Sequence, residues 1–278
     1  MTIVVGVVFH RAPRRPSIRP EPGLDVLART NAFEGERPTP WLGFGANHNL
    51  LLREAEDADW YVALNPDVGA SADDIKRLVD SADAAGLDVA APLLELPWGV
   101  RGALPALPGP GRWLRETVGA AGAGPAGESR TGGVRRSAWV SGACMALRVD
   151  RRQVRFDEDY FMYFEDAALC HSVAEAGGRV GVCEAIVVSH ESGWTDSDPL
   201  RWRRGVEFAR SALRFASETN QSPRLMRVAG FARFGSRTLL SGRSPSERVA
   251  ARALARGFAR VWQAPGLSES AADFHAGR

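Results

Sequence analysis

The chain has 278 residues, of which 45% are hydrophobic, so it is long enough to bury a sizeable core. No apolar run approaches the roughly 20 residues that cross a bilayer, and the apolar start lacks the basic stretch and cleavage site of a signal peptide. The cysteines, Cys144, Cys170 and Cys183, have no CxxC spacing, which argues against a disulfide framework or a structural zinc site. The sequence therefore predicts a cytoplasmic globular protein with buried free thiols.

Charge is distributed unevenly along the chain. The net charge is only +2, but residues 201–278 contain 15 arginines and 5 acidic residues, a net of +10 that leaves −8 for the preceding part. A basic tail on an acidic body indicates either a surface that meets phosphate groups or a solvated helical face. Of the two sources of phosphate, nucleic acid and lipid headgroups, we expect contact with a membrane surface and no nucleic acid.

Short apolar runs alternate with helical patterns in the first third of the chain. Runs rich in β-branched and aromatic residues are typical of buried strands, and apolar residues at helical spacing are typical of helices. The predicted strands cover residues 2–9, 24–28, 61–64 and 87–92, and the predicted helices cover residues 50–55 and 71–86. This alternation predicts an α/β fold with a mainly parallel central sheet flanked by helices.

The strand at residues 61–64 ends abruptly in Asn65-Pro66-Asp67. Pro66 cannot donate the next hydrogen bond of a sheet, so the strand stops where the polar side chains begin. Ligands of open α/β sheets bind at the carboxyl ends of strands, where the Asp67 carboxylate could bind a divalent cation or a sugar hydroxyl. An ordinary polar turn explains the same residues equally well.

Two glycines, Gly43 and Gly45, precede the predicted helix at residues 50–55, and Asn49 lies near its N-terminus. Glycine lets the backbone come close to a ligand, and an open helix N-terminus suits an anion. The loop lacks the full phosphate-binding spacing, so by itself it indicates a turn that could bind a ligand rather than a defined phosphate site.

Residues 97–133 break the alternating pattern and are crowded with Gly, Pro and Ala. Long irregular loops inside a compact domain are usually functional or disordered, and we expect a flexible flap over the active site. A strand at residues 138–147 follows. Ser141-Gly142 interrupts it, and a glycine inside a strand marks a bulge or a close approach to the backbone.

Acidic and aromatic residues are interleaved over residues 156–166. Carboxylates beside buried rings lose their hydration unless a cation or a hydrogen-bond donor meets them. Glu165 and Asp166 start a predicted helix, so they are either a well-capped helix start or, in the case of Asp166, a general base. His190 follows a strand at residues 180–188 and is either a satisfied polar residue or a metal ligand.

Beyond residue 199 the sequence predicts amphipathic, Arg-rich helices. Such helices suit a membrane surface or packing beneath a catalytic domain. We therefore divide the chain into a catalytic domain at residues 1–198 and a basic helical C-terminal extension at residues 199–278.

Taken together, these motifs resemble the inverting glycosyltransferases of family 2 with the GT-A fold, in their rhamnosyltransferase-like bacterial branch. The matching residues are Gly43-Phe44-Gly45 with Asn47 and Asn49, Leu64-Asn65-Pro66-Asp67-Val68, residues 140–145, residues 156–166 and His190. The resemblance covers about residues 31–194 and implies transfer of a sugar from a nucleotide-diphosphate sugar, such as dTDP-rhamnose, with inversion. The implied acceptor is a hydroxyl of a glycan, lipid-linked or small-molecule acceptor in cell-envelope polysaccharide or secondary-metabolite glycosylation.

The resemblance also implies roles for individual residues. Asp67 would bind Mg²⁺ or Mn²⁺ on the diphosphate, with His190 as a further ligand, because negative charge develops on that leaving group. Asp166, in the pair with Glu165, would deprotonate the acceptor hydroxyl. The remaining implied substrate-binding residues are Asn31, Gly43, Gly45, Asn49, Asn65, Ser141, Gly142 and Trp194, with Asp67 among them.

The N-terminus departs from the family pattern. Family members have a strand, a helix and a second strand ending in Asp-Asn-(Ala/Gly)-Ser, whereas this chain has Val8-Phe9-His10, a Pro/Arg-rich loop and a short second strand. One βα unit that would hold the nucleotide base and ribose is thus missing or shortened. A degenerate homologue acting as a scaffold or partner stays open as an alternative. So does a metal-dependent phosphohydrolase using Asp67, Glu165, Asp166 and His190.

Overall fold

A computed structural model describes residues 1–10, 16–31, 33–34, 37–38, 41–96, 99–101, 107–118, 130–131, 133–150, 154–191, 201–239 and 245–261. The chain forms two compact units. Unit 1 comprises Met1–Leu107, Pro125–Glu158 and Glu165–Glu191, and unit 2 comprises Pro108–Gly124, Asp159–Phe164 and Ser192–Arg278. Unit 2 therefore takes in three stretches of the predicted catalytic domain, at residues 108–124, 159–164 and 192–198.

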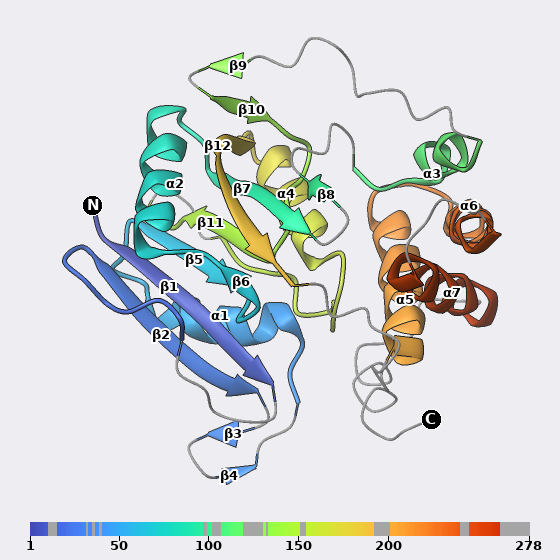
Figure 1. The fold of residues 1–278 in the computed structure, drawn as a ribbon, viewed down its shortest axis with the longest axis horizontal. Coiled ribbons are helices and arrows are strands. Elements are labelled where there is room, and N and C mark those ends of the chain that lie inside the picture. The colour runs from blue at the N-terminus through green and yellow to red at the C-terminus, as the bar shows by residue number, and fades with distance from the viewer. Residues whose placement is uncertain are drawn as a thin grey trace. The chain divides into compact units, whose positions relative to one another are not determined.

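Unit 1 is built on a large mixed sheet (Figure 1). Its strands are β1 (Ile3–His10), β2 (Leu24–Asn31), β5 (Trp60–Leu64), β6 (Val68–Gly69), β7 (Val89–Leu96), β8 (Gly99–Arg101), β9 (Arg130–Thr131), β10 (Val134–Arg136), β11 (Cys144–Arg148) and β12 (Val180–His190). A separate small hairpin joins β3 (Phe33–Glu34) and β4 (Arg37–Pro38). The main order is β2-β1-β5-β11-β7-β12-β10-β9, with β6 beside β12 and β8 beside β7.

The direction of the strands makes the sheet mostly, but not wholly, parallel. Strands β1, β2, β5, β7 and β12 run the same way, because each is parallel to its neighbour or separated from it only by β11. Strand β11 runs against both β5 and β7. The predicted α/β class with a mainly parallel sheet is confirmed.

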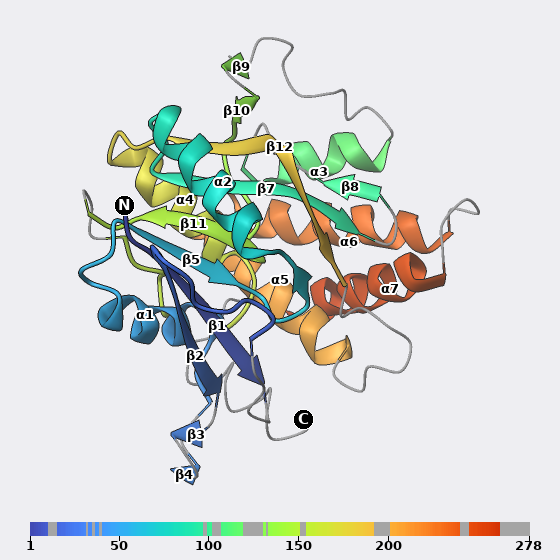
Figure 2. The same ribbon diagram turned by 60° about the vertical axis from the view of Figure 1, so that its left-hand side comes forward.

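Helices cover both faces of this sheet. Helix α2 (Ala72–Ala84) packs its apolar stripe against one face, in a core that includes Val5 and Val7 of β1. Helices α1 (Phe44–Glu54) and α4 (Glu165–Glu175) cover the other face, in a core that includes Val8 of β1 and Tyr61 of β5 (Figure 2). Successive strand residues point to opposite faces, which is why one apolar run supplies both cores.

The shortened N-terminal unit keeps its strand. Strand β2 pairs in parallel with β1 over the full register from Ile3↔Leu24 to His10↔Asn31, so the strand predicted at residues 24–28 is longer than expected. The described part of the connection, residues 16–23, contains no helix. It contributes Ile18, which is 4% exposed, to the core that α2 covers. Parallel strands are usually joined by a crossover helix, and none lies in that described part.

The strand predicted at residues 138–147 begins later than expected. Strand β11 starts at Cys144, and Ser141-Gly142 lie in the turn that precedes it. The prediction of a strand interrupted by glycine was therefore wrong at this point. A glycine and a serine favour a turn, and the buried run that follows is long enough to form the strand by itself.

Unit 2 is helical. It contains α3 (Pro110–Thr117), α5 (Arg201–Glu218), α6 (Pro223–Leu239) and α7 (Pro245–Arg260). Its core holds a cluster of aromatic rings, in which Trp113 stacks on Phe208 with ring centroids 6.2 Å apart and meets Phe234 and Phe258 edge-on. Within the described residues, no helix is both long enough and apolar enough to cross a membrane.

The segment predicted as an irregular flap, residues 97–133, contains regular structure. It supplies β8 and β9 to unit 1 and α3 to unit 2, and Trp113 of α3 is only 4% exposed. Helix α3 has only eight residues, and the proline and glycine residues just before it are typical of a loop, so its local signal is short. The aromatic core that holds Trp113 comes from distant parts of the sequence, which is why the pattern alone indicated a loop.

Candidate active site

The turn after β5 holds the first predicted site residues. All five residues of β5 are buried. Asn65 follows the strand, and its backbone N–H donates to the Ala143 carbonyl at 2.8 Å. Pro66 interrupts the ladder as predicted, and Asp67 then lies in the turn to β6 with a side chain that is 37% exposed. The strand thus delivers a solvent-accessible carboxylate at its carboxyl end.

The structure brings Asp67 and His190 together. Strand β6 pairs antiparallel with the end of β12, so that His190 lies opposite Val68. The Nε2 atom of His190 is 3.5 Å from Oδ1 of Asp67, and the backbone N–H of Glu191 donates to the Asp67 carbonyl at 3.1 Å. Two backbone contacts therefore fix a carboxylate and an imidazole side by side.

This pair fits two donors of a divalent-cation site that a diphosphate would complete. Carboxylate oxygen is a preferred ligand of Mg²⁺, and imidazole is accepted by several divalent metals. Nowhere in the described part of the chain do three or more His, Cys, Asp or Glu side chains form a group that could hold a metal by themselves. Magnesium in phosphate-transfer sites is commonly held by one or two carboxylates plus substrate phosphates and water, which agrees with such a small protein donor set.

Asp166 is held at the start of α4 by two backbone donors. The N–H of Gly142 donates to Oδ2 at 3.0 Å, and the N–H of Ala167 donates to Oδ1 at 2.8 Å. Desolvation raises the pKa of Asp166 to about 6, against the opposing effect of these hydrogen bonds. The carboxylate is thus oriented, ionised at neutral pH, and more basic than an ordinary aspartate.

The two acidic positions belong to one edge of the sheet in unit 1. Gly142, which binds Asp166, is followed by Ala143, whose carbonyl accepts from Asn65. Asn65 in turn is two residues from Asp67. A short chain of backbone contacts therefore runs from the candidate base to the candidate metal ligand. Ser141 belongs to the same turn, where its hydroxyl accepts from the Ala143 N–H at 3.3 Å.

A strained turn immediately precedes α4. Tyr163 and Phe164 have φ angles of 70° and 67°, in the left-handed region that bulky side chains rarely occupy. Such residues cost about 1–3 kcal/mol each and persist where surrounding contacts fix them. Phe164 is 6% exposed and packs on Phe208 and Phe215 within unit 2. The sequence gives no signal for this turn, because neither Tyr nor Phe favours it.

Asn49 and Gly45, predicted to bind substrate, are parts of the scaffold. Helix α1 begins at Phe44, so both residues lie inside it rather than in a loop before it. The Asn49 amide is 3% exposed and exchanges two hydrogen bonds with the backbone of Phe156, each 2.9 Å long. A Cβ on Gly45 would lie 2.6 Å from the Phe156 Cβ, so the glycine allows Phe156 to pack closely on the helix. The substrate contacts of Asn49 and Gly45 stay predictions.

Asn31 and Gly43 also have structural roles near the start of α1. Asn31 is 2% exposed, and its amide donates to the Leu42 carbonyl at 2.9 Å and accepts from the Leu42 N–H at 3.1 Å. Gly43 is the buried N-cap residue of α1. The polar groups of Asn31 are thus used within the protein, and the substrate contacts of Asn31 and Gly43 stay predictions.

Helix α1 supports the loop that holds Asp166. A Cβ on Gly142 would lie 3.4 Å from the ring of Phe44, and Phe44 meets Phe156 edge-on at 5.6 Å. Behind Phe44 lies the buried His48, whose Nδ1 is hydrogen-bonded to the Tyr61 hydroxyl at 2.7 Å. Our sequence interpretation missed this polar pair.

A signal for the His48–Tyr61 pair was present in β1. Gly6 is a glycine in a β-branched strand, and a Cβ on it would lie 1.9 Å from the Tyr61 hydroxyl oxygen. An isolated glycine inside a strand often marks the close approach of another group, which here is that hydroxyl.

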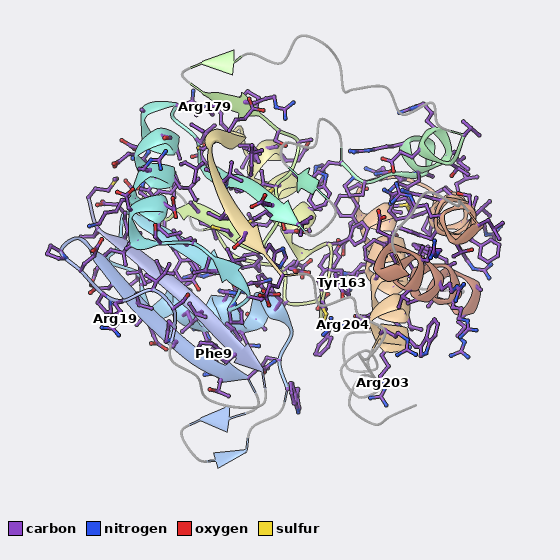
Figure 3. The ribbon with its side chains drawn as sticks, in the orientation of Figure 1. Phe9, Arg19, Tyr163, Arg179, Arg203 and Arg204 are labelled. Carbon is purple, nitrogen blue, oxygen red and sulfur yellow. The ribbon has the colours of Figure 1, made fainter. Side chains whose placement is uncertain are left out.

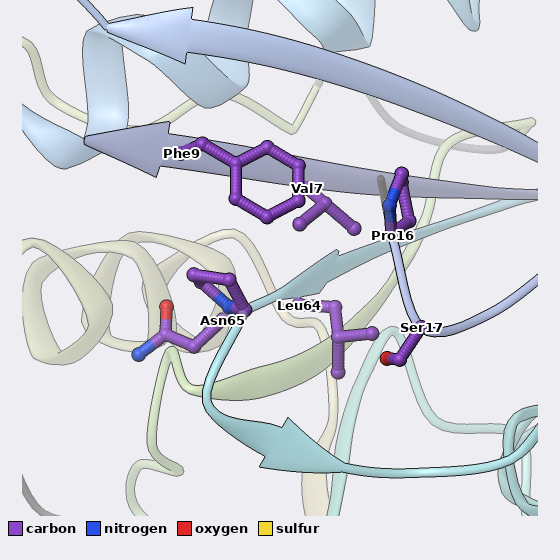
Figure 4. Close-up of a pocket in the computed structure, with 7 residues that line it drawn as sticks. Val7, Phe9, Pro16, Ser17, Leu64 and Asn65 are labelled. Atoms are coloured by element: carbon purple, nitrogen blue, oxygen red, sulfur yellow. The ribbon is translucent and has the colours of Figure 1, made fainter. Parts of the chain in front are cut away.

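One cavity of about 250 Å³ lies beside the carboxyl ends of β1 and β5 (Figure 4). Val7 and Phe9 of β1 line one side, Leu64 to Pro66 line another, and Pro16 and Ser17 of the β1–β2 connection close it. Phe9 is labelled at this end of β1 in Figure 3. The connection thus provides a wall where the family pattern led us to expect a missing part.

Glu165 and Trp194 are the remaining predicted site residues. Glu165 lies at the first position of α4 and is 7% exposed, so it is less accessible than Asp166. Trp194 falls outside the described residues, and its predicted substrate contact stays a prediction.

The amino-acid sequence of the chain is similar to those of known proteins. No family model matches the chain. Over 192 residues, 63% of the chain, it is 33% identical to the N-acetylglucosaminyl-diphospho-decaprenol L-rhamnosyltransferase of Mycobacterium tuberculosis, in strains CDC 1551 / Oshkosh and ATCC 25618 / H37Rv. The sequence is thus similar to that of a rhamnosyltransferase over part of each chain. It spans 56%, about half, of the length of these curated relatives.

Solved glycosyltransferase structures are similar at a lower level. The mannosyltransferase PcManGT of Pyrobaculum calidifontis, in complex with GDP-Man and Mn²⁺, is 15% identical with a TM-score of 0.49, over 99% of this chain and 79% of its own. GalNAc-T7 with UDP, GalNAc and Mn²⁺ is 14% identical with a TM-score of 0.49, over 82% of this chain and 56% of its own. Because both TM-scores are below 0.5, the relationship to the glycosyltransferases rests on the sequence.

Proposed function

We propose that this chain transfers a sugar, with inversion, from a nucleotide-diphosphate sugar to an acceptor hydroxyl. The observation that carries the proposal is Asp166, a carboxylate fixed by two backbone N–H donors and made more basic than usual by desolvation. The rhamnosyltransferase relative favours dTDP-rhamnose as the donor and a lipid-linked glycan as the acceptor. A cytoplasmic location, facing the inner side of the membrane, agrees with both substrates.

Asp166 acts as the general base. With a pKa of about 6 it is mostly ionised at neutral pH, and its remaining lone pairs can accept the proton of an acceptor hydroxyl. Loss of that proton makes the oxygen a stronger nucleophile as it attacks the anomeric carbon in line with the departing diphosphate. The two backbone donors keep the carboxylate in place without themselves titrating.

Asp67 and His190 would hold a divalent cation beside the leaving diphosphate. Their ligand atoms are 3.5 Å apart, and the backbone pairing of β6 with β12 keeps them there. A Mg²⁺ or Mn²⁺ ion at this position would supply positive charge where negative charge develops. Asn65, in the turn between this pair and the Asp166 loop, is the proposed contact to the sugar-nucleotide.

The cavity beside β1 and β5 is the proposed site of the nucleotide base. Its volume of about 250 Å³ is below the range of roughly 300–1,000 Å³ that encloses a whole drug-sized ligand, so it suits one part of a larger molecule. Phe9 offers an apolar surface, and Asn65 and Ser17 offer polar groups, next to the strand end that carries Asp67.

The proposal is tested by ligand-dependent stabilisation and by transfer activity. A thermal-shift screen of dTDP-, UDP- and GDP-sugars with and without Mn²⁺ should give one donor that raises the melting temperature only with the metal. Asp166→Asn should then abolish transfer to an added acceptor while leaving that donor shift in place. The matched control is Asp73→Asn, an exposed acid at the second position of α2 as Asp166 is of α4.

A scaffold without activity is the second candidate, and one observation favours it. The described part of the β1–β2 connection lacks a crossover helix, so less structure is available to hold a nucleotide. This alternative predicts no metal-dependent shift with any nucleotide-sugar, together with unchanged stability of Asp67→Asn in the presence of Mn²⁺. A shift that depends on both Mn²⁺ and Asp67 would exclude it.

A further inference from the structure

The outer face of helix α6 is apolar although it lies in solvent. Leu225, Val228 and Phe231 are 56%, 59% and 52% exposed, and Leu239 at the end of the helix is 86% exposed. Spacings of three residues place Leu225, Val228 and Phe231 along one side of a helix. We call these three residues the α6 outer face.

The opposite side of the same helix is already used for packing. Met226 and Ala229 are fully buried, and Gly230 lies against the Phe258 ring of α7, where a Cβ would come within 2.6 Å. A surface helix of a globular protein normally turns one apolar stripe inward and a polar stripe outward. Helix α6 instead has apolar residues on both sides, and packing within unit 2 explains only the inner one.

The helix that carries this face is basic. Helix α6 contains four arginines and no acidic residue, and α7, which packs on it, contains four arginines and one glutamate. Some of these arginines bind within unit 2, as Arg227 does through the Phe258 carbonyl at 2.9 Å. Arg224 is exposed beside Leu225.

An apolar face on a helix without acidic residues, next to the exposed Arg224, matches the chemistry of an anionic lipid surface. Apolar side chains enter the boundary between headgroups and acyl chains, while arginines meet the lipid phosphates. A second copy of this chain fits less well, because a symmetric contact would bring two acid-free α6 helices together. We propose that the α6 outer face binds an anionic phospholipid bilayer.

This inference does not depend on the proposed transfer activity. It rests on exposed side chains of unit 2, whereas the proposed activity rests on Asp166 and Asp67 of unit 1. A protein that bound vesicles but transferred no sugar, or the reverse, would separate the two.

Vesicle flotation with the full chain tests the proposal. We expect binding to phosphatidylcholine vesicles that contain phosphatidylglycerol, and much weaker binding to phosphatidylcholine alone. The triple variant Leu225→Ser, Val228→Ser, Phe231→Ser should bind at least about 30-fold more weakly, because three apolar side chains no longer enter the bilayer. Val187→Ser, at a 49% exposed valine of β12 in unit 1, is the matched control and should bind as the parent chain does.

A charge variant separates lipid phosphates from a purely apolar contact. Arg224→Gln should weaken binding about fivefold to the phosphatidylglycerol vesicles and not to the neutral ones, with Arg53→Gln of α1 as its exposed control. Circular dichroism and melting temperature verify that each variant folds. Unchanged vesicle binding by the triple variant, or no binding by the parent chain, would overturn the proposal. A concentration-dependent dimer that the triple variant loses would assign the face to a second copy instead.

Discussion

Replacing Asp166 by Asn should separate the chemistry of this residue from its effect on stability. The pKa of Asp166 is raised from 3.8 to about 6, chiefly by desolvation. The folded protein therefore binds this proton more tightly than the unfolded chain does. Stability from this group is present at low pH and is lost as pH rises through about 6. An asparagine does not titrate, so the variant lacks this loss.

The size of the effect follows from the shift. A rise of about two pKa units corresponds to about 3 kcal/mol between the two protonation states. The side chain is partly exposed, so we expect about 1–3 kcal/mol of this to appear in measured stability. In Asp166→Asn, the amide NH₂ replaces one carboxylate oxygen and cannot accept a hydrogen bond from the backbone N–H at that position. The lost hydrogen bond costs about 1–3 kcal/mol of stability at every pH. The cost of the lost hydrogen bond does not change with pH, so the pH dependence of stability reports only the ionisation of Asp166.

Urea unfolding of both proteins between about pH 4 and about pH 8 measures this difference. The free energy of unfolding of Asp166→Asn, relative to the parent chain, should rise by about 1–3 kcal/mol over that range. Transfer activity should fall by about 10²–10⁴-fold in the same variant, and kcat/KM of the parent chain should rise with pH through about 6. Asp73→Asn should change neither quantity. A relative stability that stays constant with pH would refute the argument that Asp166 is desolvated.

Three further outcomes are expected. Asn49→Ala should lower the free energy of unfolding by about 2–4 kcal/mol without any ligand present, because backbone groups that it binds are left buried; a substrate-binding residue would change only ligand affinity. Gly230→Ala should lower the stability by about 1–3 kcal/mol in thermal unfolding, whereas Gly235→Ala on the same helix, with open space around it, should raise it by about 0.5–1 kcal/mol. Asp67→Asn and His190→Asn should each weaken Mn²⁺-dependent donor binding in calorimetry at least about tenfold, and the double variant should lose less than the sum.

Much of the sheet could be predicted from local patterns. The runs at residues 2–9 and 61–64 are apolar on both faces, and both became buried strands with helices packed on either side. Helix α2 was also predictable, because Ser71 and Asp74 form a capping box that marks its start. The direction of β11 was not, because strand direction depends on pairing with distant strands and leaves no local pattern.

Helix α3 and the strained turn before α4 could not be predicted for a related reason. Trp113 gains its burial from rings that lie about a hundred residues later in the chain, such as Phe208 and Phe234. Tyr163 and Phe164 adopt left-handed angles only because tertiary contacts, such as those of Phe164 with the core of unit 2, fix them. Both features depend on long-range contacts that outweigh local preference.

Within the candidate site, the acids and the amides predicted from the sequence have different surroundings. Asp67, Asp166 and His190 occupy strand ends and a helix start, where the fold leaves side chains accessible, and the structure gives Asp67 and His190 each other as neighbours. Asn31 and Asn49 resemble family positions equally well, yet their side-chain amides form hydrogen bonds with backbone groups of the protein. An amide both donates and accepts, so it can satisfy a buried backbone segment by itself, and an ionised carboxylate cannot.

The glycine and asparagine motif at the start of α1 therefore has a structural role beside the predicted one. Asn49 binds the segment at Phe156, and the ring of Phe44 supports Gly142, whose N–H holds the Asp166 carboxylate. The motif thus helps to position the Asp166 carboxylate. Similar spacing in a relative would show that the support for the base is present, while activity would still require the acids at the sheet edge. This is why we place the chemistry on Asp166 and Asp67 and only the positioning of the base on α1.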